Sequence, residues 1–215
     1  MAAPALTVLM LDTAFPRIPG DVACPASYRE PVEILRVPVT VAQAVHWQPE
    51  LLDVAPFEAA LARARGELVT TSCGFLAPWH DHLARLADRP FLASVLNAPP
   101  VEESLLLTYD ACALGPAHLA GWRNVAFTGL PPDGHLRDVI GNGRDRIDFA
   151  RAEAEVVATV HQNLTDQEAV VLECTNLPPF APALRMATER PVHHILTALE
   201  ALRPGLVRRE FLTAG

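Results

Sequence analysis

The sequence predicts an α/β fold made of two similar lobes, each with a mainly parallel sheet flanked by helices. Three observations lead to this fold class. Short apolar runs alternate with helix-like segments, a pair of consecutive prolines falls near the middle of the chain, and a cysteine ends one apolar run on each side of that pair. Strands that alternate with helices are typical of parallel sheets. With 215 residues, 50% of them hydrophobic, the chain is long enough to bury a substantial core.

The expected strands are short runs of apolar and β-branched residues. Such runs suit strands whose two faces are both covered by helices. In chain order they comprise residues 7–11, 33–37, 68–72, 90–93, 105–109, 124–128 and 170–174.

The expected helices lie between or after these runs. Apolar residues recur at close to 3.6-residue spacing through 48–65, and Gly66 provides a stop for that helix. The same reasoning predicts further helices at 78–86, 144–162, 179–188 and 194–202.

The Pro99-Pro100 pair predicts the joint between the lobes, because consecutive prolines continue neither a helix nor a central strand. We therefore expect an N-terminal lobe at residues 1–98 and a C-terminal lobe at 99–190, with an active cleft between them. Residues 191–215 are expected to add a strand and a helix that pack back on the N-terminal lobe.

Charge and hydropathy restrict the partners of the chain. The formal net charge is −8, with 17 basic and 25 acidic residues, and this field repels nucleic acid and anionic membranes. No uncharged apolar run approaches the roughly 18 residues of a membrane-spanning helix, and the N-terminus leads directly into a strand-like run. We expect a cytoplasmic protein with a small-molecule partner, and neither nucleic acid nor a membrane.

Cys73 and Cys174 occupy matching places, each at the end of a strand-like run and ahead of a helix-like segment. The carboxyl end of a parallel sheet is where ligands bind, and a helix N-terminus favours a thiolate. Inverting a carbon stereocentre needs a base on one face and an acid on the other, roles that two thiols can exchange. On position alone, two buried structural cysteines explain the pattern equally well.

The remaining candidates for metal or cofactor chemistry carry little signal. Cys24 and Cys112 lack the strand-end setting, and the spacing of the four cysteines matches neither a zinc site nor a disulfide framework. His80 and His82 point apart on a helix, which argues against a metal site. The segment 141–143 lacks the third glycine of a dinucleotide fingerprint, so we expect no metal and no cofactor.

Three segments resemble the aspartate/glutamate racemase family: 71–74 (Thr-Ser-Cys-Gly), 173–176 (Glu-Cys-Thr-Asn) and 9–13 (Leu-Met-Leu-Asp-Thr). The similarity extends from about Leu6 to about Leu199. The resemblance implies two pseudo-symmetric α/β lobes, no pyridoxal phosphate or metal, and a homodimer. It also implies that Cys73 and Cys174 face each other across the α-carbon of the substrate as its acid/base pair.

The resemblance assigns substrate contacts unevenly. The Thr175 hydroxyl and nearby amides would hold a carboxylate, while Asn176 stands where family members often have histidine or glutamate. The amide of Gly74 would bind an anion, although many glutamate racemases have asparagine there. Asp12 and Thr13 resemble the early Asp-Ser pair, whose acid recognises the amino group or orients the thiol.

The sequence leaves two alternative roles for Arg17 and for the pair Thr108 and Tyr109. Arg17 is either a bidentate partner for a second carboxylate or a solvated loop residue. Thr108 and Tyr109 end a strand and either line the cleft or serve as ordinary strand residues. The predicted site then comprises the catalytic Cys73 and Cys174, with substrate contacts at Asp12, Thr13, Arg17, Thr71, Ser72, Gly74, Thr108, Thr175 and Asn176.

The sequence thus predicts a cofactor-independent amino-acid racemase or epimerase that acts on a small carboxylate-bearing substrate. Within the same superfamily, the alternatives are a hydantoin racemase, an arylmalonate decarboxylase and a maleate isomerase. The departures at Gly74, Phe75 and Asn176 also keep open a noncatalytic protein that binds a carboxylate.

Overall fold

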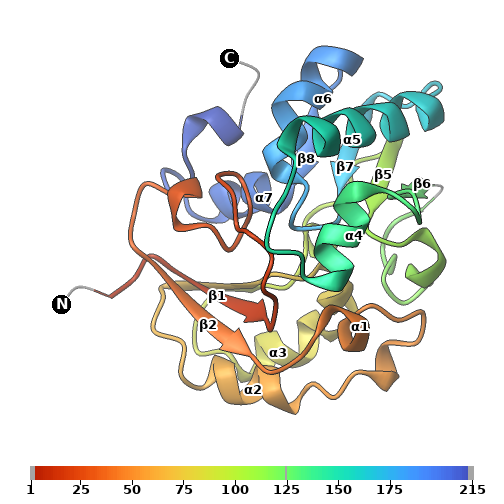
Figure 1. The fold of residues 1–215 in the computed structure, drawn as a ribbon. Helices are drawn as coiled ribbons and strands as arrows, with labels where there is room; N and C mark the ends of the chain where they lie inside the picture. Colours follow the sequence, from red (N-terminus) through yellow and green to blue (C-terminus); the bar gives the residue numbers. More distant parts are fainter. Residues whose placement is uncertain (1–2, 124, 213–215) are drawn as a thin grey trace.

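The computed structural model describes residues 3–123 and 125–212 and contains two four-stranded parallel sheets (Figure 1). The first has the order β2-β1-β3-β4 and consists of β1 (Leu6–Leu11), β2 (Val32–Val37), β3 (Leu68–Thr71) and β4 (Phe91–Leu92). The second has the order β6-β5-β7-β8 and consists of β5 (Ser104–Thr108), β6 (Ala126–Gly129), β7 (Ala169–Leu172) and β8 (Val192–His194). The predicted α/β fold with two similar lobes is confirmed.

The central strands explain why the apolar runs were visible in the sequence. Every residue of β1, β3, β5 and β7 is buried, so these strands need apolar or β-branched side chains on both faces. Along β1 the side chains alternate, with Leu9 in one core cluster and Val8 in another. The run expected at 124–128 corresponds to β6, and Asn124 lies outside the described residues.

Helices flank both sheets, and prolines account for the main difference from the expected boundaries. The helices are α1 (Val41–Ala44), α2 (Ala55–Leu61), α3 (His80–Leu86), α4 (His135–Asn142), α5 (Phe149–Asn163), α6 (Ala181–Thr188) and α7 (Ile195–Leu202). The single helix expected at 48–65 is instead a 3₁₀ turn, Pro49–Leu51, followed by the shorter α2. Pro49 and Pro56 each lie in a first turn, so the segment contains two helix starts with an extended Leu52 between them.

The start of α5 also differs from the expected one, because the Asp148 side chain accepts a hydrogen bond from the Arg151 amide and caps the helix there. The other expected helices at 78–86 and 179–188 begin with 3₁₀ turns, Gly74–Trp79 and Pro178–Phe180, before α3 and α6. No helix in the described parts of the chain has the length and apolar character needed to cross a bilayer.

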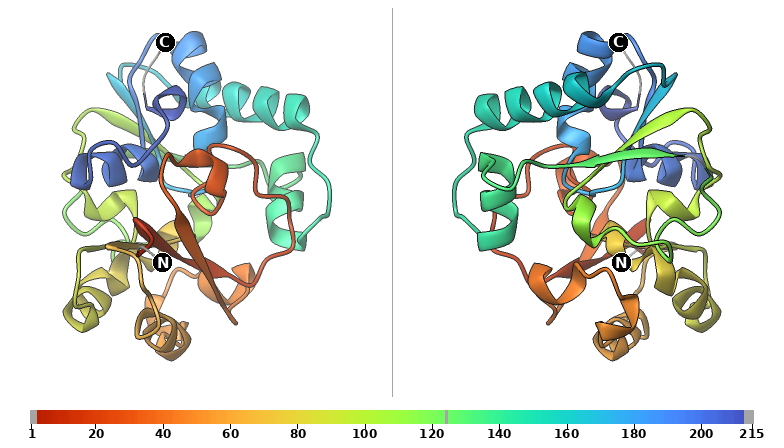
Figure 2. Two further views of the ribbon diagram at one scale, coloured as in Figure 1. Left: turned by 90° about the vertical axis from the view of Figure 1, so that its left-hand side faces the viewer. Right: turned by 90° about the vertical axis from the view of Figure 1, so that its right-hand side faces the viewer.

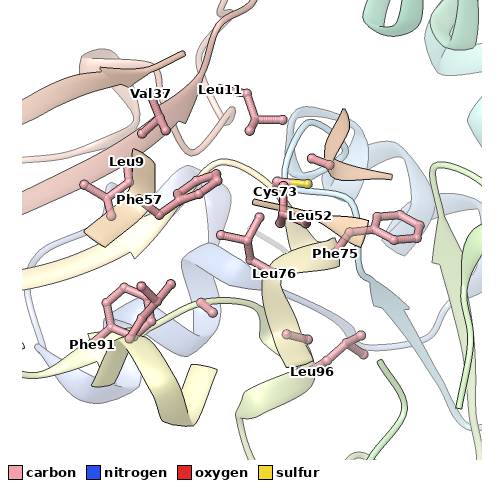
Figure 3. Close-up of a cluster of buried hydrophobic side chains, with 14 of the residues drawn as sticks. Leu9, Leu11, Val37, Leu52, Phe57, Cys73, Phe75, Leu76, Phe91 and Leu96 are labelled. Atoms are coloured by element: carbon pink, nitrogen blue, oxygen red, sulfur yellow. The ribbon is translucent and has the colours of Figure 1, made fainter. Parts of the chain in front are cut away.

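Two large hydrophobic clusters hold the lobes, and the first, shown in part in Figure 3, also includes Leu106 and Val171 of the second sheet. There Leu9, Phe57 and Leu76 pack between the sheet and the helices α2 and α3. The second core lies between β5, β7 and the helices α5 and α6. Cys73 belongs to the first cluster and Cys174 to the second, so the two cysteines pack against different sets of apolar side chains.

The C-terminal segment crosses back to the first lobe (Figure 2). Side chains of α7 and the residues after it, including Ile195, Leu199 and Val207, pack in one cluster with Leu6 and Val8 of β1. A single antiparallel bridge pairs Tyr28 with Val207, and Arg203 forms ion pairs with Glu30 and Glu67. The second face of the first sheet is thus covered by residues from the far end of the chain.

Candidate active site

The two strand-end cysteines line one pocket between the lobes. Cys73 follows β3 and precedes the 3₁₀ turn at Gly74, and Cys174 follows β7. The pocket encloses about 300 Å³ of space that includes its opening to solvent, and it is lined by Leu11, Val41, Val45, Ser72, Cys73, Gly74, Phe75, Tyr109, Ile140, Glu173, Cys174, Thr175 and Asn176. The topological repeat therefore brings the two sulfurs to one site.

Most of the pocket wall is apolar or aromatic. Val41 and Val45 come from α1 and the residue after it, and Ile140 comes from α4. Phe75 and Tyr109 add aromatic rings from the ends of the central strands. Such a wall excludes water and strengthens the electrostatic interactions inside the pocket.

Burial raises the pKa of both thiols, which favours their protonated forms. It raises the pKa of Cys73 to about 12, and the nearby Glu173 charge adds to that rise. The pKa of Cys174 also lies well above its usual value, first because of burial and then because of Glu173. The amide of Phe75 and the charge of Arg17 lower the pKa of Cys73, as expected near a helix start, but burial outweighs them.

Glu173 is the acidic side chain among the described pocket residues. It is fully buried, and burial raises the pKa of its carboxyl to about 7. The Thr108 hydroxyl donates a hydrogen bond of 2.7 Å to Oε2, whereas Oε1 has no hydrogen-bond partner among the described residues. Sequence reasoning did not assign Glu173 a role; its signal was a charged residue directly after the apolar run of β7.

Polar side chains that follow Cys174 reach into the first lobe. The Thr175 hydroxyl donates to the backbone oxygen of Ser72 at 2.7 Å. The Asn176 amide nitrogen donates to Oδ2 of Asp21 at 2.7 Å, while its oxygen accepts from the Cys174 thiol at 3.6 Å. These contacts fix the two strand ends relative to each other.

The structure brings six of the predicted site residues to the pocket and places five beyond its lining. The six are Ser72, Cys73, Gly74, Cys174, Thr175 and Asn176. Thr108 lies behind the pocket, where it holds Glu173. The Thr71 hydroxyl donates to the backbone oxygens of Cys73 and Ala93, so it supports the end of β3.

The other predicted contacts form their own ion pairs. The Asp12 side chain is half exposed and pairs with Arg36 at 2.7 Å. Arg17 donates to the Thr13 hydroxyl at 2.7 Å and pairs with the buried Asp21 at 3.1 Å. Arg17 is nevertheless near enough to lower the pKa of Cys73.

Within the described residues, no cluster of three or more His, Cys, Asp or Glu side chains could hold a metal ion. His82 pairs with Glu58 at 2.5 Å, and the Nδ1 atom of His80 accepts the Ala93 amide at 3.4 Å. These two histidines therefore have separate partners.

Comparison with solved structures identifies the fold. Across 96% of this chain and 97% of the other, the chain superimposes on an aspartate racemase from Picrophilus torridus with a TM-score of 0.55 and 12% identity. It matches an unliganded arylmalonate decarboxylase with a TM-score of 0.56 and 16% identity over 94% and 97% of the two chains. The chain has the racemase-like fold. An allantoin racemase from Klebsiella pneumoniae shares this racemase-like fold with a TM-score of 0.59 and 11% identity, over 92% and 85% of the chains.

The sequence relatives carry a different activity in their names. A dimethylsulfoniopropionate lyase 5 from Emiliania huxleyi (strain CCMP1516) is 29% identical over 93% of this chain, which spans 45% of that protein. A dimethylsulfoniopropionate lyase from Durusdinium sp. clade D is 26% identical over 94% of this chain and 75% of its own length. The chain thus spans less than half of the first relative. No protein-family model matches the sequence.

Proposed function

We propose that this chain is a cofactor-independent lyase that removes a proton from the carbon next to a carboxylate and expels a β-substituent, with dimethylsulfoniopropionate as its substrate. The observation that carries this proposal is the convergence of Cys73 and Cys174 on one largely apolar pocket. The lyases that align with more than nine-tenths of the chain support the choice of reaction.

The proposed reaction needs one thiolate as a base. The thiolate takes a proton from the carbon beside the carboxylate, and that electron pair forms the carbon–carbon double bond. The bond between the neighbouring carbon and the sulfonium sulfur breaks, which releases neutral dimethyl sulfide and leaves acrylate. The proton remains on the cysteine and later passes to water, so atoms and charge balance.

The pocket wall suits a sulfonium better than an amino group. Phe75 contributes an aromatic ring for a small organic cation, and the aliphatic wall accommodates its methyl groups; the Tyr109 ring also lines the pocket, with the Arg137 guanidinium 5.1 Å from its centre. Asp12, the acid expected to recognise an α-amino group, is paired with Arg36 and lies off the pocket lining. These features support a carboxylate substrate without an α-amino group.

A second candidate is the racemisation or epimerisation of an amino acid. It is favoured by one observation, the presence of a thiol from each lobe at the same pocket. One cysteine would remove the α-proton and the other would return a proton to the opposite face. This reaction requires both cysteines, whereas the elimination requires a base on one side.

Two assays on the reduced protein separate these candidates. Release of dimethyl sulfide from dimethylsulfoniopropionate is followed by gas chromatography, and acrylate by NMR. In parallel, aspartate, glutamate and other amino acids are incubated in heavy water, and deuterium at the α-carbon is measured. The Cys112→Ser variant serves as a thiol control, because Cys112 is exposed and lies off the pocket lining.

Release of dimethyl sulfide supports the lyase, and deuteration at the α-carbon without elimination supports the racemase. The absence of both reactions, with the thiols shown to be reduced, would overturn the assignment of proton-transfer chemistry to this pocket.

A further inference from the structure

Glu173 is a buried acidic residue in the pocket, and the proposed elimination assigns it no role. The side chain is 0% exposed, and only Oε2 receives a hydrogen bond, from Thr108. Oε1 has no hydrogen-bond partner within the described parts of the chain. Leaving a buried carboxyl oxygen unpaired costs stability, and such an atom in a pocket is a candidate for chemistry.

The contact with Gly74 locates the unpaired oxygen. A methyl group built on Gly74 would lie 1.9 Å from Oε1 of Glu173 and 2.5 Å from its backbone oxygen. The carboxyl of the second lobe therefore fills the space beside the residue that follows Cys73. This contact also explains why glycine is needed at position 74.

The two thiols differ in their availability to this carboxyl. The Cys174 thiol donates to the side-chain oxygen of Asn176, whereas the Cys73 thiol has no hydrogen bond to a described residue. Cys73 and Glu173 line the same pocket without a hydrogen bond between the thiol and Oε1, so proton transfer needs the two groups to come into hydrogen-bond contact when substrate binds.

Several charged and titratable groups surround this pair. Ionised Glu173 raises the pKa of both thiols, so a state in which one of these three groups is ionised is favoured over states in which two or three are. From the first-lobe loop, Arg17 lowers the pKa of Cys73, and Asp21 raises that of Cys174. At the end of β5 and just after it, the Thr108 hydroxyl and the backbone of Tyr109 favour the ionised form of Glu173.

We propose that Glu173 is the proton acceptor that activates Cys73. As the Cys73 sulfur takes the proton from the substrate carbon, the S–H bond breaks and its original proton moves to Oε1. The negative charge thereby passes from the carboxylate to the departing electron pair of the carbon–hydrogen bond. Glu173 acts through Cys73. The transfer to substrate rests on the proposed function, but the coupling between Glu173 and the thiol does not.

Activity as a function of pH provides the first test. Glu173→Gln keeps the size of the side chain and removes the base, so we expect kcat/KM at pH 7 to fall by about 100-fold or more. The deficit should shrink by about tenfold or more near pH 10, where Cys73 begins to ionise by itself. Thr108→Val is the matched variant: it keeps the carboxylate, and by removing a hydrogen bond to the charged form it should move the acidic limb of the profile upward by about half a unit or more.

A second test needs no substrate. In a Cys174→Ala background, the rate of Cys73 alkylation by iodoacetamide is measured against pH by peptide mass spectrometry. Glu173→Gln should lower the pH midpoint of alkylation by about one unit or more, because a neutral amide no longer opposes the thiolate. The variant then has more thiolate and yet lower activity at pH 7, a combination that a purely structural role does not produce.

The outcomes are separable. If wild-type protein turns over no substrate, the proposed function fails, and the alkylation midpoint still tests Glu173. An unchanged midpoint, or a loss of activity that is the same at every pH, would overturn the role of Glu173. If Glu173→Gln does not fold by circular dichroism, an unmoved acidic limb in Thr108→Val overturns it instead.

Discussion

The two strand ends that carry the cysteines have the same place in the topology but different chemical surroundings. After β3, the chain passes Cys73 and Gly74 into a turn whose residues are mostly buried and apolar. After β7, Cys174 stands between Glu173 and Thr175, and polar contacts extend from there into the first lobe. The repeated topology places the two sulfurs. The residues after β3 form an apolar wall, whereas the residues after β7 form polar contacts with the first lobe.

The first prediction tests whether the two thiols are equivalent. Glu173 lies beside Gly74, next to Cys73, whereas the Cys174 thiol is hydrogen-bonded to Asn176, so we assign the role of base to Cys73. We therefore expect Cys73→Ala to lower kcat for elimination by about a thousandfold or more. Cys174→Ala should lower it by only about ten- to a hundredfold. Steady-state kinetics at saturating substrate provide the measurement. Losses that agree within about threefold would instead indicate symmetrical, two-thiol chemistry.

The second prediction concerns the close approach of the lobes at Gly74. Gly74→Ala would place a methyl group within 1.9 Å of Oε1 of Glu173, and the variant should lose about 3 kcal/mol or more of unfolding free energy. Urea denaturation measures the loss. Shortening the partner in Gly74→Ala/Glu173→Ala should recover part of it, although the nearby backbone oxygen remains. Strict additivity of the two changes would show that these residues do not interact.

The third prediction concerns the pH dependence of stability. The pKa of Glu173 is raised from 4.5 to about 7 on folding, so its contribution is fully present below pH 4.5 and is lost as pH rises through 7. Glu173→Gln does not titrate. The variant should therefore gain stability relative to wild type between pH 5 and pH 9, by up to about 3 kcal/mol. Denaturation curves across that range would contradict this if the difference stayed constant.

The fourth and smallest effect is expected at the polar anchor of the second strand end. Thr175→Val removes the donor to the Ser72 backbone oxygen and should cost about 1–2 kcal/mol. Thr159→Val is the control, because the buried Thr159 hydroxyl donates to the backbone oxygen of Glu155 within its own helix. Thermal unfolding should show a clearly larger drop for Thr175→Val; equal drops would argue against a special role for the contact between lobes.

The sequence was most informative where structure depends on local pattern. The buried central strands require unbroken apolar runs, and both cysteines immediately follow such runs, so the α/β fold and the paired strand ends could be predicted. Helix boundaries were less accessible where proline and capping decide them, as at Pro56 and Asp148.

Pocket residues outside the strand ends could not be found from the sequence. Val41 and Ile140 line the pocket because α1 and α4 pack against each other across the lobes, and no local pattern specifies that contact. Asp12 shows the converse limit. It follows β1 at the expected edge of the sheet, but it pairs with Arg36 of the neighbouring strand and is not part of the pocket lining.

The return of α7 to the first sheet has a consequence for dividing the molecule. A fragment cut at the Pro99-Pro100 pair would leave Leu6 and Val8 facing water, because Ile195 and Leu199 cover them in the whole chain. The first half cannot complete its hydrophobic interior from its own residues. The two halves are expected to be recovered only as a non-covalent pair, so the apparent symmetry of the architecture does not make its halves autonomous folding units.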